Sequence, residues 1–189
     1  SILSTSYKTT STEGNLNNHI GVPLSLLKIK DDTEFSVIEL GANNFGEIDF
    51  LTKMAEPDYG YITNFGKAHL EGFKNISGVI RAKTELYNWL IINNKILILN
   101  YDDPEQIKFK SSNHFSFGSK LESKYMFEII ESDNVIVKCN NMVYETCLYG
   151  DYNFSNVCSA IAIGLEFGID PKIIRKKLKN FSSKNNRSE

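Results

Sequence analysis

The sequence predicts an α/β fold, a mostly parallel sheet flanked by helices, with a small antiparallel β lobe. Between residues 35 and 99, short apolar segments alternate with segments of helical periodicity, which is typical of parallel strands joined by right-handed crossovers. After Pro104 the pattern changes to short strands separated by turn-rich segments such as SDN and CNN. This second pattern predicts a meander or hairpin lobe.

Proline positions and apolar spacing define the predicted elements of the first half. Pro23 lies near the first turn of the first helix, where its missing N–H costs no hydrogen bond. A second helix has Ile48, Phe50 and Leu51 facing inward, and Pro57 follows it because proline cannot continue a helix. In order, we predict a helix over 24–29, a strand over 35–40, a helix over 46–55, a strand over 59–63, a helix over 76–90 and a strand over 95–99.

The second half contains the predicted β lobe and two further helices. Val157, Ala160, Ile161 and Gly164 recur at helical spacing, and Pro171 stands at the start of the last apolar-periodic segment. We predict strands over 114–117, 125–131, 135–139 and 142–148, followed by helices over 153–167 and 171–181.

Composition describes an ordinary globular protein and disfavours several functions. The chain has 189 residues, of which 41% are hydrophobic, enough for one sizeable core. The formal net charge of -2 lacks the basic excess that duplex DNA demands, so we expect no nucleic-acid partner. Three cysteines without a CxxC pair fit a reducing compartment and argue against structural zinc. No apolar run approaches the roughly 20 residues that span a bilayer, so we expect a cytoplasmic protein with no membrane contact. No obligate protein partner is evident from the sequence either.

The segment from residue 59 to residue 87 holds the strongest candidate site. Asn64, His69 and Glu71 follow a predicted strand, and Lys83 lies in the next helix. Ligands of α/β sheets bind outside the carboxyl ends of parallel strands, and a histidine in such a loop can hold a metal or a phosphate. The alternative is a solvated His–Glu pair of the kind that exposed loops often carry.

Glu39 and Lys83 each allow a structural and a functional interpretation. Glu39 ends the predicted strand VIEL and precedes GANN, where a carboxylate could hold Mg²⁺ or could simply cap the loop. An acid directly after apolar strand residues would need a reason to leave water, which favours function. Lys83 has apolar neighbours in its helix, and by spacing alone it is a surface lysine whose stem packs on them.

Two asparagine-rich segments add weaker signals. GNLNN, over residues 14–18, suits a loop that hydrogen-bonds a peptide or sugar, although such loops are also good turns. In YNFSN, Asn153 and Asn156 stand three apart at a helix start, near one face, where N-capping is the structural alternative.

Several motifs together resemble the Mur ligases. EGNLNNHIGVPLSLLKI, VIELGANNFGEIDFL, NFGKAHLEGF, AKTELY, LNYDDP and GDYNFSNVCSAIAIG occur in the order and spacing of that family. The resemblance covers nearly the whole chain and implies the family's central ATP-binding domain, with a fold like that of P-loop NTPases, over residues 1–181. Residues 182–189 resemble the junction to the family's third domain.

The resemblance implies an amide-forming ligase of peptidoglycan synthesis. GNLNN and ELGANN resemble the members that add D-alanyl-D-alanine to a UDP-N-acetylmuramoyl-tripeptide. These enzymes use ATP to phosphorylate a carboxylate, and an amine then attacks the acyl phosphate. Alternatives are another Mur-type ligase, such as one resembling folylpolyglutamate synthase, or a non-catalytic module that binds peptidoglycan precursors.

The resemblance also implies roles for individual residues. Glu39 would bind one Mg²⁺ beside the ATP phosphates, and His69 would hold a second Mg²⁺ near the acyl phosphate. Lys83 matches a lysine that reacts with carbon dioxide to give a carbamate, which needs a neutral amine and so a lowered pKa; this replaces the surface interpretation. Asn64 and Glu71 would orient the His69 loop. ATP contacts would come from Asn153, Asn156, Asp102 and Asp103, and substrate contacts from Asn15, Asn17, Asn18, Asn43 and Asn44.

One family motif is missing from the sequence. The phosphate-binding loop ending in GKT or GKS occurs nowhere in the 189 residues. Without that loop and without the third domain, we expect these residues by themselves to be inactive, while the parent protein would be the enzyme.

Overall fold

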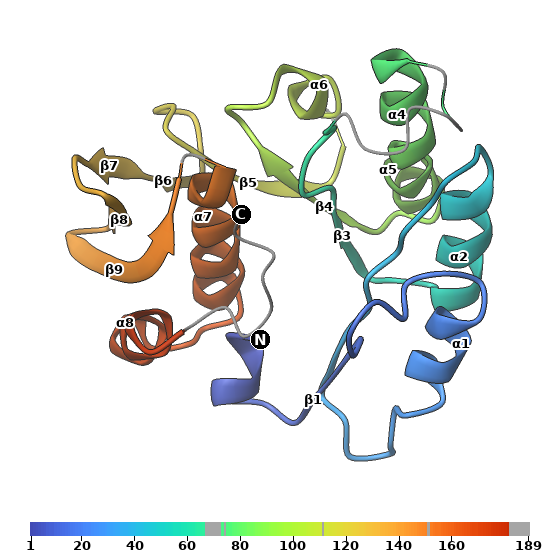
Figure 1. Cartoon of the computed structure of the whole chain (residues 1–189), viewed down its shortest axis with the longest axis horizontal. Helices are drawn as coiled ribbons and strands as arrows, with labels where there is room; N and C mark the ends of the chain where they lie inside the picture. The colour runs from blue at the N-terminus through green and yellow to red at the C-terminus, as the bar shows by residue number, and fades with distance from the viewer. Residues whose placement is uncertain (67–72, 74, 111, 151, 182–189) are drawn as a thin grey trace. The chain divides into compact units, whose positions relative to one another are not determined.

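The computed structural model describes residues 1–66, 73, 75–110, 112–150 and 152–181 (Figure 1). The chain divides into two compact units. Unit 1 comprises residues 1–6, 100–107 and 116–189, and unit 2 comprises residues 7–99 and 108–115. The division passes through two strands, β4 (Ile96–Asn100) and β5 (His114–Gly118). Both units contribute residues that the sequence proposed for function.

The strands form three sheets, and the predicted α/β class is confirmed. A two-stranded parallel sheet pairs β1 with β2, and a four-stranded sheet has the order β3-β4-β5-β6. Its β3–β4 and β5–β6 pairs are parallel, whereas β7, β8 and β9 form an antiparallel sheet. The bounds are β1 Thr9–Ser11, β2 Phe35–Val37, β3 Tyr59–Tyr61, β6 Tyr125–Met126, β7 Glu128–Ile130, β8 Asn134–Cys139 and β9 Met142–Tyr149.

The predicted β lobe is smaller than its strand pattern suggested. We expected every strand after Pro104 to belong to it, but β5 and β6 belong to the parallel sheet. Four of the five β5 residues are buried, as expected for a strand covered on both faces. Only β7, β8 and β9 form an antiparallel lobe, in which β8 alternates between inward and outward side chains. The single predicted strand over 125–131 is likewise two strands, because Phe127 separates them.

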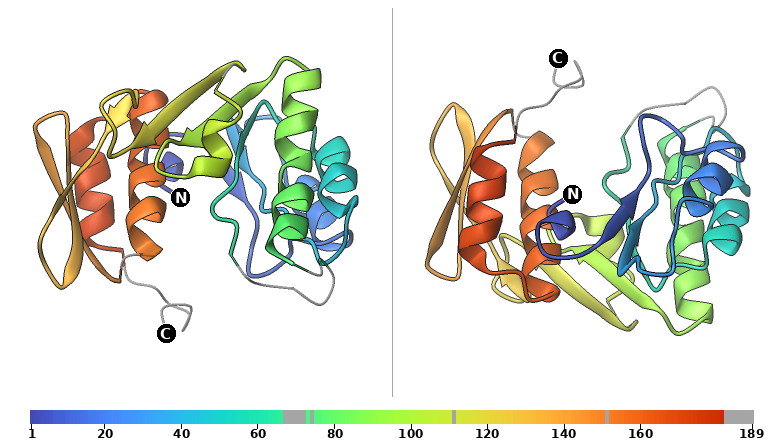
Figure 2. Two further views of the ribbon diagram at one scale, coloured as in Figure 1. Left: turned by 90° about the horizontal axis from the view of Figure 1, so that it is seen from above. Right: turned by 90° about the horizontal axis from the view of Figure 1, so that it is seen from below.

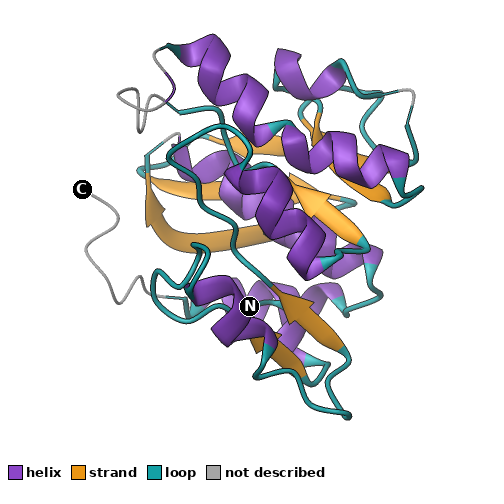
Figure 3. Ribbon diagram, turned by 90° about the vertical axis from the view of Figure 1, so that its right-hand side faces the viewer, coloured by secondary structure: helices purple, strands orange, loops and turns teal. Residues whose placement is uncertain are grey.

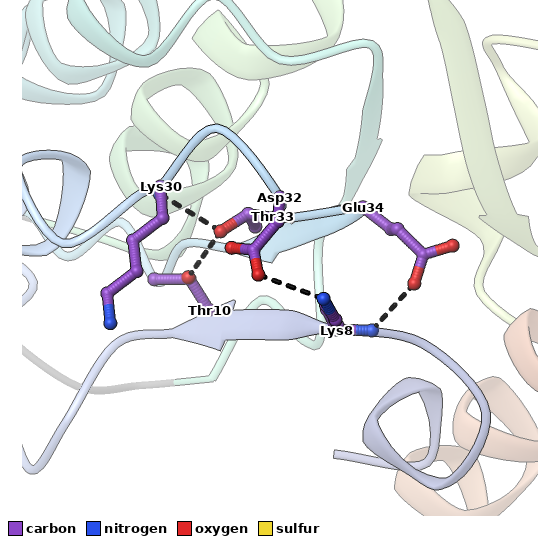
Figure 4. Close-up of polar contacts among 6 residues, drawn as sticks. All are labelled: Lys8, Thr10, Lys30, Asp32, Thr33 and Glu34. Atoms are coloured by element: carbon purple, nitrogen blue, oxygen red, sulfur yellow. Dashed lines mark hydrogen bonds and ion pairs between the residues drawn. The ribbon is translucent and has the colours of Figure 1, made fainter.

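A polar cluster holds the β1–β2 sheet at the start of unit 2 (Figure 4). The hydroxyl oxygens of Thr10 and Thr33 lie 3.3 Å apart, and Thr33 Oγ1 also accepts the backbone N–H of Lys30 at 3.0 Å. Lys8 Nζ bonds Asp32 Oδ2 at 2.9 Å, and Lys8 N donates to Glu34 Oε2 at 2.9 Å. These polar contacts add to the backbone pairing of a sheet whose strand β2 is largely exposed.

Helices of unit 2 pack against one another beside the β3–β4 strands (Figure 3). Helix α2 buries Ile48 and Leu51, but Phe50 is 53% exposed, so the prediction that Phe50 faces the core is wrong. The helix begins after Gly46, which takes a left-handed φ of 82°, and it ends before Pro57. The helices are α1 Gly21–Leu26, α2 Glu47–Ala55, α4 Ile76–Lys83 and α5 Glu85–Ile92, and α1 therefore includes Pro23 and ends earlier than predicted.

The predicted helix over 76–90 is two helices that meet at Thr84. The Thr84 hydroxyl donates to the backbone carbonyl of Arg81 at 3.1 Å, and side-chain contacts of this kind are associated with bent helices. The Thr84 N–H still bonds the Ile80 carbonyl at 2.9 Å. Helix α4 ends at Lys83 and α5 begins at Glu85. The break places these two charged side chains at the junction of two helix axes.

Tyr87 joins α5 to the middle of β4 and to the residue that follows β3. Its ring is fully buried, its hydroxyl donates to the Ile98 carbonyl at 2.8 Å, and it accepts the N–H of Ile62 at 3.3 Å. Gly60 in β3 lets α5 approach, because a Cβ there would collide with the Leu90 side chain. The chain leaving β3 is thereby held in place.

In unit 1, α8 packs on β9, and α7 packs on α8 and on β8 (Figures 1 and 2). The core includes Tyr144, Val137 and Phe127, together with Ile161 and Ile174 from the two helices. Residues of α7 recur at helical spacing as predicted, with bounds Tyr152–Glu166, and α8 runs Pro171–Lys179 with Asp170 capping its start. A short helix α6, Pro104–Ile107, and a 3-10 turn, Leu3–Thr5, complete the unit.

The cysteines and the apolar character of the helices bear on disulfide formation and on membrane crossing in the described part of the chain. Cys139, Cys147 and Cys158 are free thiols. Burial raises the pKa of Cys139 to about 11, which makes it an inert packing residue. Among the described residues, no helix has both the length and the apolar character required to cross a membrane.

Candidate functional site

Glu39 lies just after β2, where its carboxylate is held by the GNLNN loop. Asn17 Nδ2 donates to Glu39 Oε1 at 2.7 Å, and Glu39 N donates to Thr12 Oγ1 at 2.9 Å. The strand ends at Val37, and Glu39 is exposed rather than buried. The expectation that the Glu39 side chain is buried is therefore wrong, because the edge strand β2 is too short and too exposed to cover it.

The close approach of the two loops depends on Gly41. The Gly41 N–H donates to the backbone carbonyl of Asn17 at 2.8 Å. A Cβ on Gly41 would lie 2.8 Å from the side-chain amide of Asn17, too close for any real contact. The glycine of ELGANN therefore lets Asn17 reach Glu39.

The asparagines of GANN are bound by a glutamate four residues downstream. Glu47 Oε2 accepts the backbone N–H groups of Asn43 and Asn44 at 2.7 and 3.2 Å, and Glu47 Oε1 accepts Asn44 Nδ2 at 2.9 Å. These hydrogen bonds, led by that of the Asn44 side chain, lower the pKa of Glu47. The loop thus has a fixed backbone that leaves the Asn43 and Asn44 positions exposed.

Lys83 reaches the segment that leaves β3. Its Nζ donates to the Asn64 backbone carbonyl at 2.6 Å and lies 3.5 Å from Asn64 Oδ1, which also accepts the N–H of Gly66. Lys83 is half-buried, and desolvation lowers its pKa. The lowered pKa expected for this lysine is confirmed, and it favours the neutral amine that carbamate formation needs.

The remaining asparagines of GNLNN serve the loop itself. Asn18 Oδ1 accepts the N–H groups of Ile20 and Gly21 at 3.1 and 2.9 Å, at the start of α1. The Asn15 backbone carbonyl accepts the N–H of Asn17 at 2.8 Å, and the Asn15 side chain lies at an exposed position. Among the described residues, Asn17 is the one of the three whose side chain contacts another candidate site residue.

The acidic pair after β4 lies in unit 1, where both carboxylates hold turns. Asp102 accepts the backbone N–H of Ser119 at 2.8 Å and the Ser119 hydroxyl at 2.8 Å. Asp103 Oδ1 accepts the N–H of Glu105 at 2.9 Å, at the start of α6. Gly118 lies against Asp102 with a φ of 153°, so the turn after β5 is built around this carboxylate.

Asn153 and Asn156 occupy the first turns of α7 but differ in environment. Asn153 is buried, and its Nδ2 donates to the Tyr149 carbonyl at 2.8 Å. Since an N-cap side chain accepts a hydrogen bond and Asn153 donates one, N-capping does not explain it. Asn156 is exposed, so the expected common face for the two amides is only partly realised.

The structure brings some of the proposed residues together. In unit 2, Asn17 contacts Glu39 and Lys83 contacts Asn64. The four residues proposed for ATP belong to unit 1, namely Asp102, Asp103, Asn153 and Asn156. His69 and Glu71 lie outside the described residues.

The donor chemistry around Glu39 fits Mg²⁺. Its carboxylate is a hard oxygen ligand of the kind that Mg²⁺ binds through one or two acids plus substrate phosphates. Within the described ranges, no three His, Cys, Asp or Glu side chains gather as a complete metal cluster.

Sequence reasoning missed two glutamates that shape this site. Glu47 stands four residues after Asn43 at a helix start, so its spacing held the signal for a cap. Glu85 carries no such signal, because its partners, the N–H groups of Gly46 and Asp49, are 39 and 36 residues away.

Comparison with known proteins identifies the family of this chain. The family described as the Mur ligase middle domain matches residues 1–164. A UDP-N-acetylmuramoyl-tripeptide--D-alanyl-D-alanine ligase from Bacillus subtilis is 33% identical over 94% of this chain and 39% of its own length. The ligase of that name from Escherichia coli is 32% identical over 96% of this chain and 42% of its own length. The chain therefore spans about two fifths of the curated relatives it matches.

A solved structure supports the same relationship. A crystal structure of MurF from Acinetobacter baumannii superposes with a TM-score of 0.83 at 32% identity, over 98% of this chain and 43% of that one. The family match covers most of the chain and the sequence relatives cover nearly all of it. The chain belongs to the Mur ligase middle domain family.

Proposed function

We propose that the parent protein is an ATP-dependent ligase that joins D-alanyl-D-alanine to UDP-N-acetylmuramoyl-tripeptide in peptidoglycan synthesis. The relatives that carry this activity in their names, at 33% and 32% identity over nearly the whole chain, support the proposal. The observation that carries it is Lys83, a half-buried lysine with a lowered pKa in the AKTELY motif. Because ATP is the energy source, the parent would work in the cytoplasm.

The reaction would proceed in two balanced steps. The terminal carboxylate of the tripeptide attacks the γ-phosphorus of ATP, which forms an acyl phosphate and releases ADP. The amine of D-alanyl-D-alanine then attacks the acyl carbon, and the tetrahedral intermediate collapses with loss of inorganic phosphate and of the amine proton. Negative charge develops on oxygen atoms in the transition state of both steps, so catalysis depends on neutralising that charge and on positioning the reactants.

Glu39 would hold Mg²⁺ beside the phosphates. The magnesium ion would supply neutralisation of charge on the transferring phosphoryl group. Asn17 would fix the direction of the Glu39 carboxylate through its 2.7 Å hydrogen bond. His69 is proposed as a ligand to a second Mg²⁺, with Asn64 and Glu71 orienting its loop.

Lys83 would act as a carbamate. The neutral amine adds carbon dioxide and loses a proton, which converts a cation into a carboxylate-like ligand. Desolvation supports this step because it lowers the pKa of the amine. The carbamate nitrogen keeps one N–H, which suffices for the hydrogen bond to the Asn64 carbonyl.

The other candidates divide between two ligands. The proposed ATP contacts are Asn153, Asn156, Asp102 and Asp103. The hydrogen bonds of Asn153 to the Tyr149 carbonyl and of Asp102 to the Ser119 N–H fix the backbone around them before ATP binds. The nucleotide-linked peptide would contact the exposed loops that carry Asn15, Asn17, Asn18, Asn43 and Asn44.

Activity of the full-length parent protein tests the proposal. With UDP-N-acetylmuramoyl-tripeptide, D-alanyl-D-alanine, ATP and Mg²⁺, we expect ADP release coupled to formation of the pentapeptide product. Lys83→Met should abolish product formation, whereas Lys53→Met, a change at a 63% exposed lysine of the same unit, should not. Absence of product with this dipeptide, together with turnover of a different amine, would assign the protein to another ligase of the family.

A further inference from the structure

We propose that Glu85 is a positioning residue that fixes the GANN loop, residues 41–46, relative to Lys83. This inference rests on the proposed function, since the loop carries the Asn43 and Asn44 positions assigned to the substrate. Glu85 lies two residues after Lys83, across the break at Thr84. It belongs neither to the metal ligands nor to the substrate contacts proposed above.

The Glu85 carboxylate supplies the cap that α2 lacks. Gly46 occupies the N-cap position and has no side chain to accept the free N–H groups of the first turn. Instead Glu85 Oε1 accepts the N–H of Gly46 at 2.8 Å, and Glu85 Oε2 accepts the N–H of Asp49 at 3.0 Å. Both carboxylate oxygens thus bind one helix end, where a negative charge also meets the helix dipole favourably.

The segment from Lys83 to Glu85 contacts the loops that follow two different strands. Lys83 bonds the Asn64 carbonyl after β3, while Glu85 bonds the end of the loop that follows β2. With Thr84 between them, the two side chains are tied covalently within three residues. Movement of the GANN loop away from Lys83 therefore requires loss of two charge-assisted hydrogen bonds.

Helix α4 holds the same loop through side-chain packing. The Arg81 guanidinium lies 5.3 Å from the centre of the Phe45 ring, and Phe45 meets Phe73 edge-on at 5.6 Å. Ala42 packs on a cluster that contains Val79 and Ala82. These contacts pack the GANN loop against α4. Glu85 fixes Gly46, the last residue of the loop, and the first turn of α2.

The variant that tests this role is Glu85→Gln. Glutamine keeps one acceptor oxygen but turns an NH₂ group toward one of the two backbone N–H groups, which leaves that donor unpaired. Asp170→Asn is the matched control, because Asp170 also caps a helix, accepting the Lys172 N–H at 2.7 Å in unit 1. Both changes remove one charge from a helix cap, but only the first touches the GANN loop.

The first measurement is steady-state kinetics of the full-length protein. A purely structural loss lowers the fraction of folded enzyme and so lowers kcat at constant KM. Positioning predicts that Glu85→Gln raises the KM for UDP-N-acetylmuramoyl-tripeptide about 10-fold, the size typical of residues that orient a site through another group. The control should keep the KM of the wild type. An unchanged KM in Glu85→Gln would overturn the proposal.

The second measurement does not depend on activity. Hydrogen exchange of the chain should show faster exchange of the backbone amides of residues 43–49 in Glu85→Gln, with no change there in Asp170→Asn. Equal exchange in both variants would contradict the positioning role. If the wild type lacks ligase activity but exchange behaves as expected, the proposed function fails while the structural coupling stands.

Discussion

The side-chain amide of Asn17 donates a 2.7 Å hydrogen bond to Glu39, while the backbone carbonyl of the same asparagine accepts the N–H of Gly41. One residue therefore orients the proposed metal ligand and fixes the backbone just after it. The contact joins GNLNN to ELGANN, the two motifs whose resemblance pointed to the members that add D-alanyl-D-alanine.

Asn17→Ala tests that contact. The substitution removes the hydrogen bond to Glu39 but keeps the backbone bond to Gly41, so we expect Mg²⁺-dependent nucleotide binding by the full-length protein to weaken about 10-fold. Calorimetric titration with a non-hydrolysable ATP analogue and Mg²⁺ measures the dissociation constant of the nucleotide. Asn15→Ala is the control, because the contact of Asn15 runs through its backbone carbonyl. Equal weakening by both substitutions would remove the special role of Asn17.

A carbamate on Lys83 is directly observable. In ¹³C-labelled bicarbonate, we expect one carbamate carbon signal by NMR for the chain. Lys83→Met should eliminate the signal, and Lys53→Met should retain it, because Lys53 is 63% exposed and bonded to Asp49 at 2.6 Å. A signal that persists in Lys83→Met would place the carbamate elsewhere.

The desolvation of Lys83 also predicts a pH dependence of stability. The pKa is lowered in the folded protein, whereas in the unfolded chain it is near its usual value of about 10.4. Between these two values the unfolded state binds more protons, so the Lys83 contribution to stability rises with pH there and is least favourable below both.

Urea unfolding in carbon dioxide-free buffer measures this trend. Relative to Lys83→Met, the wild type should gain stability as pH rises through the folded pKa toward about 10.4. A difference between the two proteins that stays constant with pH would show that the amine is not desolvated in solution.

The β1–β2 cluster of Figure 4 offers a comparison of two polar contacts. The Lys8–Asp32 pair is 68% and 62% exposed, so Lys8→Met should cost less than about 0.5 kcal/mol. Thr33→Val removes the acceptor of the Lys30 N–H and the contact with Thr10, and we expect a loss of about 1 kcal/mol. Denaturant unfolding of both variants compares them, and the reverse order would contradict this ranking.

Local signals in the sequence predicted most elements but not their partners. Pro57 marked the end of α2, and apolar spacing marked α7, because both act within one turn of helix. The break at Thr84 was missed, since a single threonine inside a periodic segment gives little warning. The sheet assignment of β5 was also missed, because a run of apolar residues does not tell a parallel strand from a lobe strand.

The candidate site shows the same limit. Lys83 looked like a surface residue by spacing, and only its resemblance to the family and then its burial revealed a perturbed amine. Glu39 was predicted to leave water and is exposed, because burial depends on neighbouring strands that the local sequence does not specify. Asn17 and Glu39 are 22 residues apart in the sequence. Their contact could not be predicted, because it depends on how the chain between them folds back.

The helix break at Thr84 sets a strict length for the segment around it. Each residue added to or removed from a helix rotates the downstream chain by about 100° around the helix axis. A deletion or insertion between Lys83 and Glu85 would therefore aim one of the two side chains away from its strand end. This tripeptide therefore works as a fixed spacer between two loops.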